Sequence, residues 1–132
     1  MSKSAIYTTN TTGATVPAGD IIPVGNTTRR YGRNIKQDGN AITLCGQGYY
    51  LVNVSGTLSP SAAGTVSITA QKDGVPIIRA TGAQTAADNG TVNIGISAIV
   101  RDARECESSI LSLVLGGVAA IVNNIAVTIE KL

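Results

Sequence analysis

The sequence contains no histidine, no phenylalanine and no tryptophan among its 132 residues. Without histidine, neither a Ser-His nor a Cys-His nucleophile can be assembled, and the commonest general base and metal ligand are also missing. Tyrosine is the one aromatic residue type present, so the core must be made mainly from Val, Ile, Leu and Ala. These side chains each bury a modest apolar area, and subunit association is one natural way to bury more.

Charge and long apolar runs are also scarce. The formal net charge is +2, which predicts neither a nucleic-acid nor a membrane partner. The longest apolar stretch, Ile110 to Val122, is interrupted by serine and glycine and is shorter than the roughly 20 residues of a membrane helix, so we interpret it as two strands. Residues 2 to 10 lack the apolar region of a secretory signal, and we therefore expect the chain to fold where it is made.

The two cysteines, Cys45 and Cys106, form neither a metal-ligand pattern nor a dense disulfide framework. A bridge between them would close a long loop, which stabilises a fold by about 4 kcal/mol in the chain-entropy model. A reducing cytosol favours free thiols instead, and the sequence leaves both states open. No glycine-rich phosphate loop precedes a helix, so we expect no cofactor and no metal.

The sequence does contain a repeated alternation of apolar and polar residues, which is the period of a β-strand. Between Tyr49 and Leu58, for example, Tyr50, Val52 and Val54 share one face. Residues such as Asp73-Gly74, Gly116-Gly117 and Asn123-Asn124 are typical of the turns between strands. The strands predicted in this way are Ile42 to Cys45, Tyr49 to Leu58, Thr65 to Lys72, Val75 to Ala80, Thr91 to Arg101, Ile110 to Leu115, Val118 to Val122 and Ile125 to Ile129.

This spacing predicts an all-β antiparallel sandwich or barrel, with about eight strands after residue 40 and no convincing amphipathic helix. Residues 41 to 132 form its expected core. Residues 1 to 40 are expected to belong to the same domain and to supply an N-terminal arm and the first strands. Within them, Thr8 to Gly19 is rich in Thr, Asn and Gly, which indicates a mobile arm or a long loop before the sandwich begins.

A basic cluster, formed by Arg29, Arg30, Arg33 and Lys36, departs from the otherwise even distribution of charge. Such a cluster could meet phosphate, an acidic protein surface, the acidic loop near the C-terminal strands, or a neighbouring subunit. Only Tyr31 is available to stack a base, so single-strand nucleic-acid binding is poorly supported. We regard the cluster as a docking surface for another protein.

The acidic segment is Asp102 to Glu107, which interleaves three carboxylates with Arg104. Two carboxylates brought together in a cleft are the machinery of glycoside hydrolysis. A solvated charged loop is the simpler interpretation of the same residues. We therefore assign no catalytic residue and expect the protein not to be an enzyme.

Three segments resemble the jelly rolls of the tumour-necrosis-factor and complement-globular-head superfamily: Gly48-Tyr49-Tyr50-Leu51-Val52, the turn Lys72-Asp73-Gly74, and the closing strand Ile125 to Leu132. From Ser4-Ala5-Ile6-Tyr7 onward, the chain is also similar to short proteins encoded among the structural genes of phages and prophages of gut bacteria. Its C-terminal strands resemble those of bacterial spore-surface trimers. The resemblance implies a jelly-roll sandwich that assembles as a homotrimer on a particle surface.

The resemblance also implies where the subunits meet. In this superfamily the tyrosine of the Gly-x-Tyr motif packs between the sheets, which corresponds to Tyr50, and the following residue faces the threefold axis, which corresponds to Leu51. The same face of the closing strand would be axial too. The implied trimer interface, more polar than the family usually builds, consists of Tyr49, Leu51, Asn53, Ala126, Thr128, Glu130 and Leu132.

The function expected from these observations is a non-enzymatic structural protein of a phage particle, either a capsid decoration or a head-fibre module. It would be made in the host cytoplasm and located on the virion surface, with its own copies and a capsid or other virion protein as partners. The basic cluster or the Thr8 to Gly19 segment would dock on the shell. The alternatives are a spore-surface protein and an adhesin head that binds a surface glycan, for which the tyrosines Tyr7, Tyr31, Tyr49 and Tyr50 are the available platforms.

Overall fold

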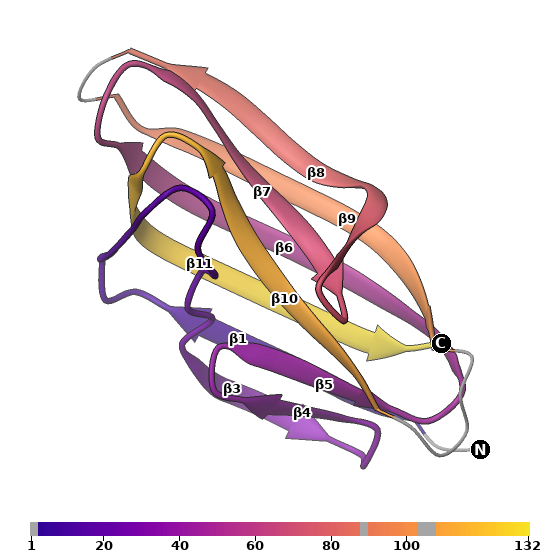
Figure 1. The fold of residues 1–132 in the computed structure, drawn as a ribbon. Helices are drawn as coiled ribbons and strands as arrows, with labels where there is room; N and C mark the ends of the chain where they lie inside the picture. Colours follow the sequence, from indigo (N-terminus) through magenta and orange to yellow (C-terminus); the bar gives the residue numbers. More distant parts are fainter. Residues whose placement is uncertain (1–2, 88–89, 103–107) are drawn as a thin grey trace.

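The computed structural model describes residues 3–87, 90–102 and 108–132, which fold into two antiparallel sheets packed face to face (Figure 1). Within these residues there are strands but no helix. Sheet A has the order β3-β1-β11-β6-β9, with β2 also paired to β11, and contains β1 (Ala5–Asn10), β2 (Ala14–Val16), β3 (Asn26–Tyr31), β6 (Gly48–Pro60), β9 (Val92–Asp102) and β11 (Ala120–Lys131). Sheet B has the order β4-β5-β10-β7-β8 and contains β4 (Ile35–Asp38), β5 (Ala41–Cys45), β7 (Gly64–Lys72), β8 (Val75–Ala86) and β10 (Ser108–Gly117).

The two-residue alternation of the sequence is confirmed as the burial pattern of the strands. On β6, Tyr50, Val52 and Val54 are buried between the sheets, whereas Tyr49 and Asn53 are exposed on the other face. The same division holds on β7, β9 and β11. The predicted all-β antiparallel sandwich is therefore the fold that the chain adopts.

Two of the predicted turns lie where the sequence places them. Asp73 and Gly74 both have positive φ, at 54° and 82°, and connect β7 to β8 in a tight hairpin. Gly117, with a φ of 86°, ends β10 before β11 begins. The apolar stretch Ile110 to Val122 is accordingly divided between two strands, as predicted.

The predicted turn at Asn123-Asn124 is wrong, because β11 runs without interruption from Ala120 to Lys131. Its pairing with β6 shifts register between Val122 and Asn124, which accommodates one extra residue as a β-bulge. Asparagine is common both in turns and in such irregular strand positions, so the residue type alone could not distinguish the two.

The prediction of an arm or loop over Thr8 to Gly19 is also wrong. Both β1 and β2 pair with β11, and β1 lies inside sheet A between β3 and β11. Two inward positions of β1 are polar, Thr8 and Asn10, so the alternation that marks the other strands is hidden here. The Asn10 side chain is satisfied locally, because it donates to the Pro23 carbonyl and accepts from the Thr12 amide.

Thr8 offers a test of how much a buried hydroxyl costs this core. Its side chain is fully buried, and its Oγ1 has no hydrogen-bond partner. Thr8→Val keeps the shape and removes the unsatisfied group, so we expect it to raise the free energy of unfolding by about 1 kcal/mol. Urea denaturation monitored by circular dichroism measures this, with Thr8→Ala as a control that also leaves a cavity. A lower unfolding free energy for Thr8→Val would contradict the interpretation.

Candidate interaction surface

The outer face of sheet A brings together all seven residues of the implied trimer interface. They come from β6 and β11, which are paired throughout their length, and from Leu132, whose amide donates to the Tyr49 carbonyl. Thr128 lies opposite Asn53 and Glu130 lies opposite Leu51 in the register. The structure thus places these side chains on one continuous surface, although it contains a single copy of the chain.

Neighbouring strands contribute further residues to this face that the sequence analysis did not assign. In the register of sheet A, Leu51 pairs with Ile99 of β9, and Glu130 pairs with Ala5 of β1. Ile99 is 59% exposed. The sequence does contain a signal for Ile99. It is an apolar residue at an outward position of the strand Thr91 to Arg101, where the alternation predicts a polar residue.

One end of the face is apolar. Tyr49, Leu51, Ile99 and Leu132 gather where β6, β9 and β11 approach one another, and three of them are among the most exposed large hydrophobic residues described. The guanidinium of Arg101 lies 5.9 Å from the centre of the Tyr49 ring, within the range of a cation–π contact. We call these four residues the apolar end.

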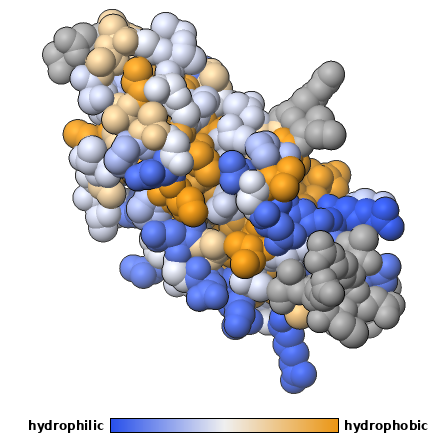
Figure 2. Space-filling model, viewed as in Figure 1, coloured by the Kyte–Doolittle hydropathy of each residue, from blue (hydrophilic) through white to orange (hydrophobic). Residues whose placement is uncertain are grey.

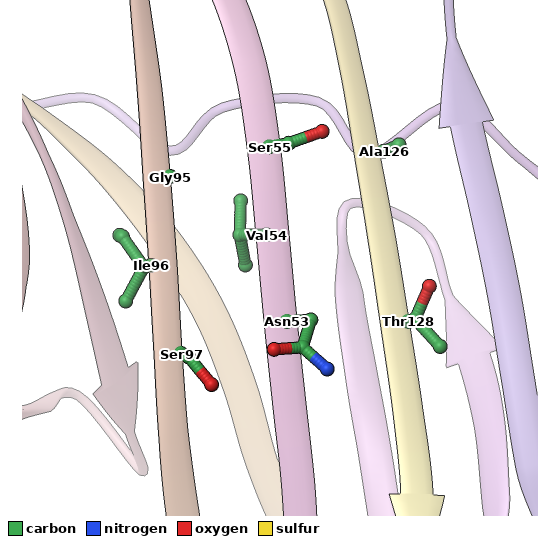
Figure 3. A pocket seen from close by; sticks show the side chains of 8 residues that line it. All are labelled: Asn53, Val54, Ser55, Gly95, Ile96, Ser97, Ala126 and Thr128. Carbon is green, nitrogen blue, oxygen red and sulfur yellow. The ribbon is translucent and has the colours of Figure 1, made fainter.

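The middle of the face is a shallow hollow of about 360 Å³ between β9, β6 and β11, whose lining includes the polar side chains of Asn53, Ser55 and Ser97 (Figure 3). It exists because small residues such as Gly95, Ser55 and Ala126 lie side by side across three strands. A second hollow of about 340 Å³ adjoins it, where the Thr57 hydroxyl donates to Asn93 Oδ1 at 2.8 Å. These groups can form hydrogen bonds, but neither hollow is lined by an ionisable side chain.

The basic cluster lies on the long side of the sandwich where sheet A ends in β3 and sheet B ends in β4. Arg29 and Arg30 belong to β3, Arg33 follows it, and Lys36 belongs to β4. All four are exposed. The Arg30 Nε donates to the Ile35 carbonyl at 2.6 Å, which links the two edge strands. Figure 2 shows hydrophilic residues gathered over this side of the molecule, where β3 and β4 lie.

The acidic segment Asp102 to Glu107 was one candidate partner of the basic cluster. Asp102 is buried at the end of β9, on the opposite edge of sheet A from β3. Glu105, Glu107 and Cys106 lie outside the described residues. Cys45 is exposed and carries a free thiol. Within the described part of the chain, no group of three Cys, Asp or Glu side chains could hold a metal ion.

Tyr50 fixes the turn that precedes β6. Its ring is fully buried, and its hydroxyl donates to the carbonyls of Gly46 at 2.7 Å and Cys45 at 3.2 Å. Burial, with smaller contributions from Asp102 and Cys45, raises the pKa of Tyr50 from 10.0 to about 12. The residue is therefore structural, and it is not available as a platform for a sugar.

The raised pKa of Tyr50 predicts a specific alkaline sensitivity. Folding favours the protonated phenol, so its contribution is complete below pH 10.0 and is lost as the pH rises toward about 12. We expect the unfolding free energy of the native protein to fall across this window more steeply than that of Tyr50→Phe, which has no phenol to ionise. Urea titrations at several alkaline pH values measure the difference. Parallel curves for the two proteins would contradict the prediction.

The comparisons with known proteins rest on structure alone, since no family model and no curated protein sequence matches the chain. Murine APRIL superposes with a TM-score of 0.76 at 11% identity, over 98% of this chain and 99% of that one. The globular domain of zebrafish complement 1qA gives 0.67 at 8% identity, over 97% and 95%. The fold is the tumour-necrosis-factor-like jelly roll. The PRD1 vertex protein P5 shares this jelly roll, with a TM-score of 0.66 at 16% identity over 98% and 96% of the two chains.

The expected jelly-roll fold is thus confirmed, with matches that cover 97% or 98% of this chain. At these identities the likeness concerns the fold and does not carry a function with it. In the part of the chain that the structure describes, there is no helix that is long and apolar enough to cross a membrane.

Proposed function

We propose that the protein is a non-enzymatic structural subunit that assembles as a homotrimer through the outer face of sheet A. The observation that carries this proposal is the apolar end, in which Tyr49, Leu51, Ile99 and Leu132 are all presented on one side of the molecule. Exposed apolar residues scattered singly need no explanation, whereas a cluster on one face is typical of an interface. The superfamily resemblance independently assigns three of the four to the threefold axis.

The composition of the face fits subunit association better than ligand binding. The apolar end supplies a region that an interface would desolvate, and the hydroxyl and amide groups around the two hollows in the middle of the face supply a region that can stay hydrated. Glu130 lies between Ala5 and Leu51 in the register. Three copies of this carboxylate near an axis would repel one another unless Lys131 or Arg101 neutralised them, so we expect trimer strength to depend on salt.

We further propose that the trimer belongs to the surface of a phage particle, as a capsid decoration or a head-fibre module, with the basic cluster as its attachment surface. Three observations support this: the resemblance to phage structural proteins, the likeness of fold to the PRD1 vertex protein P5, and four exposed cations on one side of the sandwich. A β-sandwich with a small net charge and no histidine suits stable display.

The adhesin alternative receives less support. Of the four tyrosines considered as sugar platforms, Tyr50 is buried and Tyr49 carries Arg101 over its ring. Tyr7 and Tyr31 remain exposed, but the hollow beside them offers few hydrogen-bonding groups to a sugar.

Native mass spectrometry at micromolar concentration tests the assembly, and fractionation of particles tests the location. We expect a mass of three chains, and we expect the protein to sediment with purified particles until high salt releases it. A monomer in solution would refute the trimer. Particles that lack the protein would refute its place on the virion.

A further inference from the structure

β3 is the edge strand of sheet A on the side of the basic cluster. Within the described residues, β1 is the only strand that pairs with β3, and all six side chains of β3 are exposed. Gln37 of β4 contacts the beginning of this edge, through Thr27 and the Gly25 carbonyl. Along the remainder, Thr28 to Tyr31, the one contact with β4 that involves a hydrogen bond is that of the Arg30 side chain with the Ile35 carbonyl, among the described residues. No strand of the described chain pairs with this edge, and such an edge can accept another strand.

The charge on this edge restricts which strand it can accept. Arg29 and Arg30 belong to β3, and Arg33 and Lys36 flank it, with no ion pair to any carboxylate among the described residues. A second copy of β3 would bring arginines against arginines, which is the arrangement that proteins use to prevent edge-to-edge pairing. An acidic strand would instead bring carboxylates against these cations.

An apolar hollow lies beside the same edge, on the outer face of sheet A. It has a volume of about 180 Å³ and is lined by residues of β1 and β3 together with Thr128, including Tyr7, Tyr31 and Arg29. Tyr7 is 38% exposed and Tyr31 is 58% exposed, and both residues line the hollow. Its lining is almost entirely apolar, which suits a hydrocarbon side chain rather than a sugar hydroxyl.

We infer that β3 receives an extended acidic segment of another protein, which adds as a strand along Thr28 to Tyr31. Its outward carboxylates face Arg29, which shares the outer face with Tyr7, and one apolar side chain occupies the hollow between Tyr7 and Tyr31. Backbone pairing supplies affinity, and the charges and the hollow supply selectivity. This inference rests on the proposed attachment role of the basic cluster, because it gives the chemistry of the particle protein that would be bound.

Fluorescence anisotropy with a short fluorescein-labelled peptide tests the inference. The peptide has threonine at its inward positions. Its three outward positions carry glutamate, leucine and glutamate, in that order. We expect saturable binding that weakens with salt, and no binding when lysine replaces glutamate. In two further peptides every second backbone amide is N-methylated, and the two peptides differ in which of the two sets of amides is blocked. Because only one edge of an added strand pairs with β3, one of the two should bind and the other should not.

Protein variants locate the site. Arg29→Glu should weaken binding of the peptide by about tenfold or more, equivalent to about 1.4 kcal/mol, and Tyr31→Ser should remove the preference for leucine over serine at the centre of the peptide. Arg33→Glu makes the same change of charge just outside the strand and should weaken binding by less than about threefold. If Arg29→Glu and Arg33→Glu weakened peptide binding equally, the binding would depend only on the overall positive charge. That result would overturn strand addition.

Two other outcomes would overturn the inference. Equal binding of both N-methylated peptides would exclude backbone pairing, and binding of a sulfated oligosaccharide in the absence of peptide binding would identify the edge as a glycan surface. Native mass spectrometry of the same samples separates this inference from the proposed function. A trimer that does not bind the peptide refutes strand addition alone, whereas a monomer that binds it refutes the trimer alone.

Discussion

Gly117→Ala is expected to destabilise the protein by about 3 kcal/mol or more, the largest effect of any single methyl group that we predict. Gly117 has a φ of 86°, a conformation that disfavours every residue with a Cβ. The added Cβ would also overlap the Thr65 carbonyl oxygen and approach the Val66 Cα. Because both obstacles are backbone atoms of β7, relief requires moving the paired strands β7 and β10.

A matched control separates the two causes. Gly74 has nearly the same φ, 82°, but no atom lies within 4 Å of the position its Cβ would take. Gly74→Ala should therefore show only the conformational cost, about 1 kcal/mol. Urea denaturation of both variants measures the two values. If they were equal, the close approach of Gly117 to β7 would have no energetic consequence and the prediction would be wrong.

Ile99→Glu is expected to convert the proposed trimer into a folded monomer at about micromolar concentration. In the single chain Ile99 is 59% exposed, so a carboxylate at this position remains hydrated and the fold tolerates it. In the assembled state the same carboxylate would be buried at the apolar end beside Leu51, with Glu130 in the same register row. Burying an unpaired charge costs far more than the contact contributes.

The measurement is native mass spectrometry, together with far-ultraviolet circular dichroism to show that the monomer keeps its strands. Ala83→Glu is the matched control, because Ala83 is exposed on β8 of sheet B, away from the proposed interface. It introduces the same charge and should leave the trimer intact. A trimeric Ile99→Glu protein would place the interface elsewhere, and dissociation of Ala83→Glu would show that added charge alone is sufficient.

The long strands between residues 41 and 132 could be predicted because each repeats its alternation several times. Tyr50, Val52 and Val54 identify the inner face of β6 without reference to any other part of the chain. The first strands could not be found in this way. In β1 the inward side chains after Ile6 are Thr8 and Asn10, and β3 is exposed along its whole length, so neither has a periodic apolar pattern.

The candidate surface shows the same division. The outward residues of β6 and β11 can be predicted once one inward residue is known, because every second residue of a strand faces the same side. The contribution of Ile99 and Ala5 depends on which strands are neighbours, and β1, β9 and β11 are far apart in the sequence. The hollow between Tyr7 and Tyr31 depends in addition on the pairing of β1 with β3.

The sequence by itself determined the chemistry of this protein: a β-sandwich made of small branched residues, without histidine, with one basic cluster and with a fixed set of outward side chains on each strand. These properties are local, because the alternation of a strand has a period of two residues. The tertiary structure decided which strands lie side by side, and so created the apolar end, the two hollows and the sheet edge at β3. Strand pairing joins residues distant in the chain, and its register depends on the packing of the whole sandwich rather than on any local pattern.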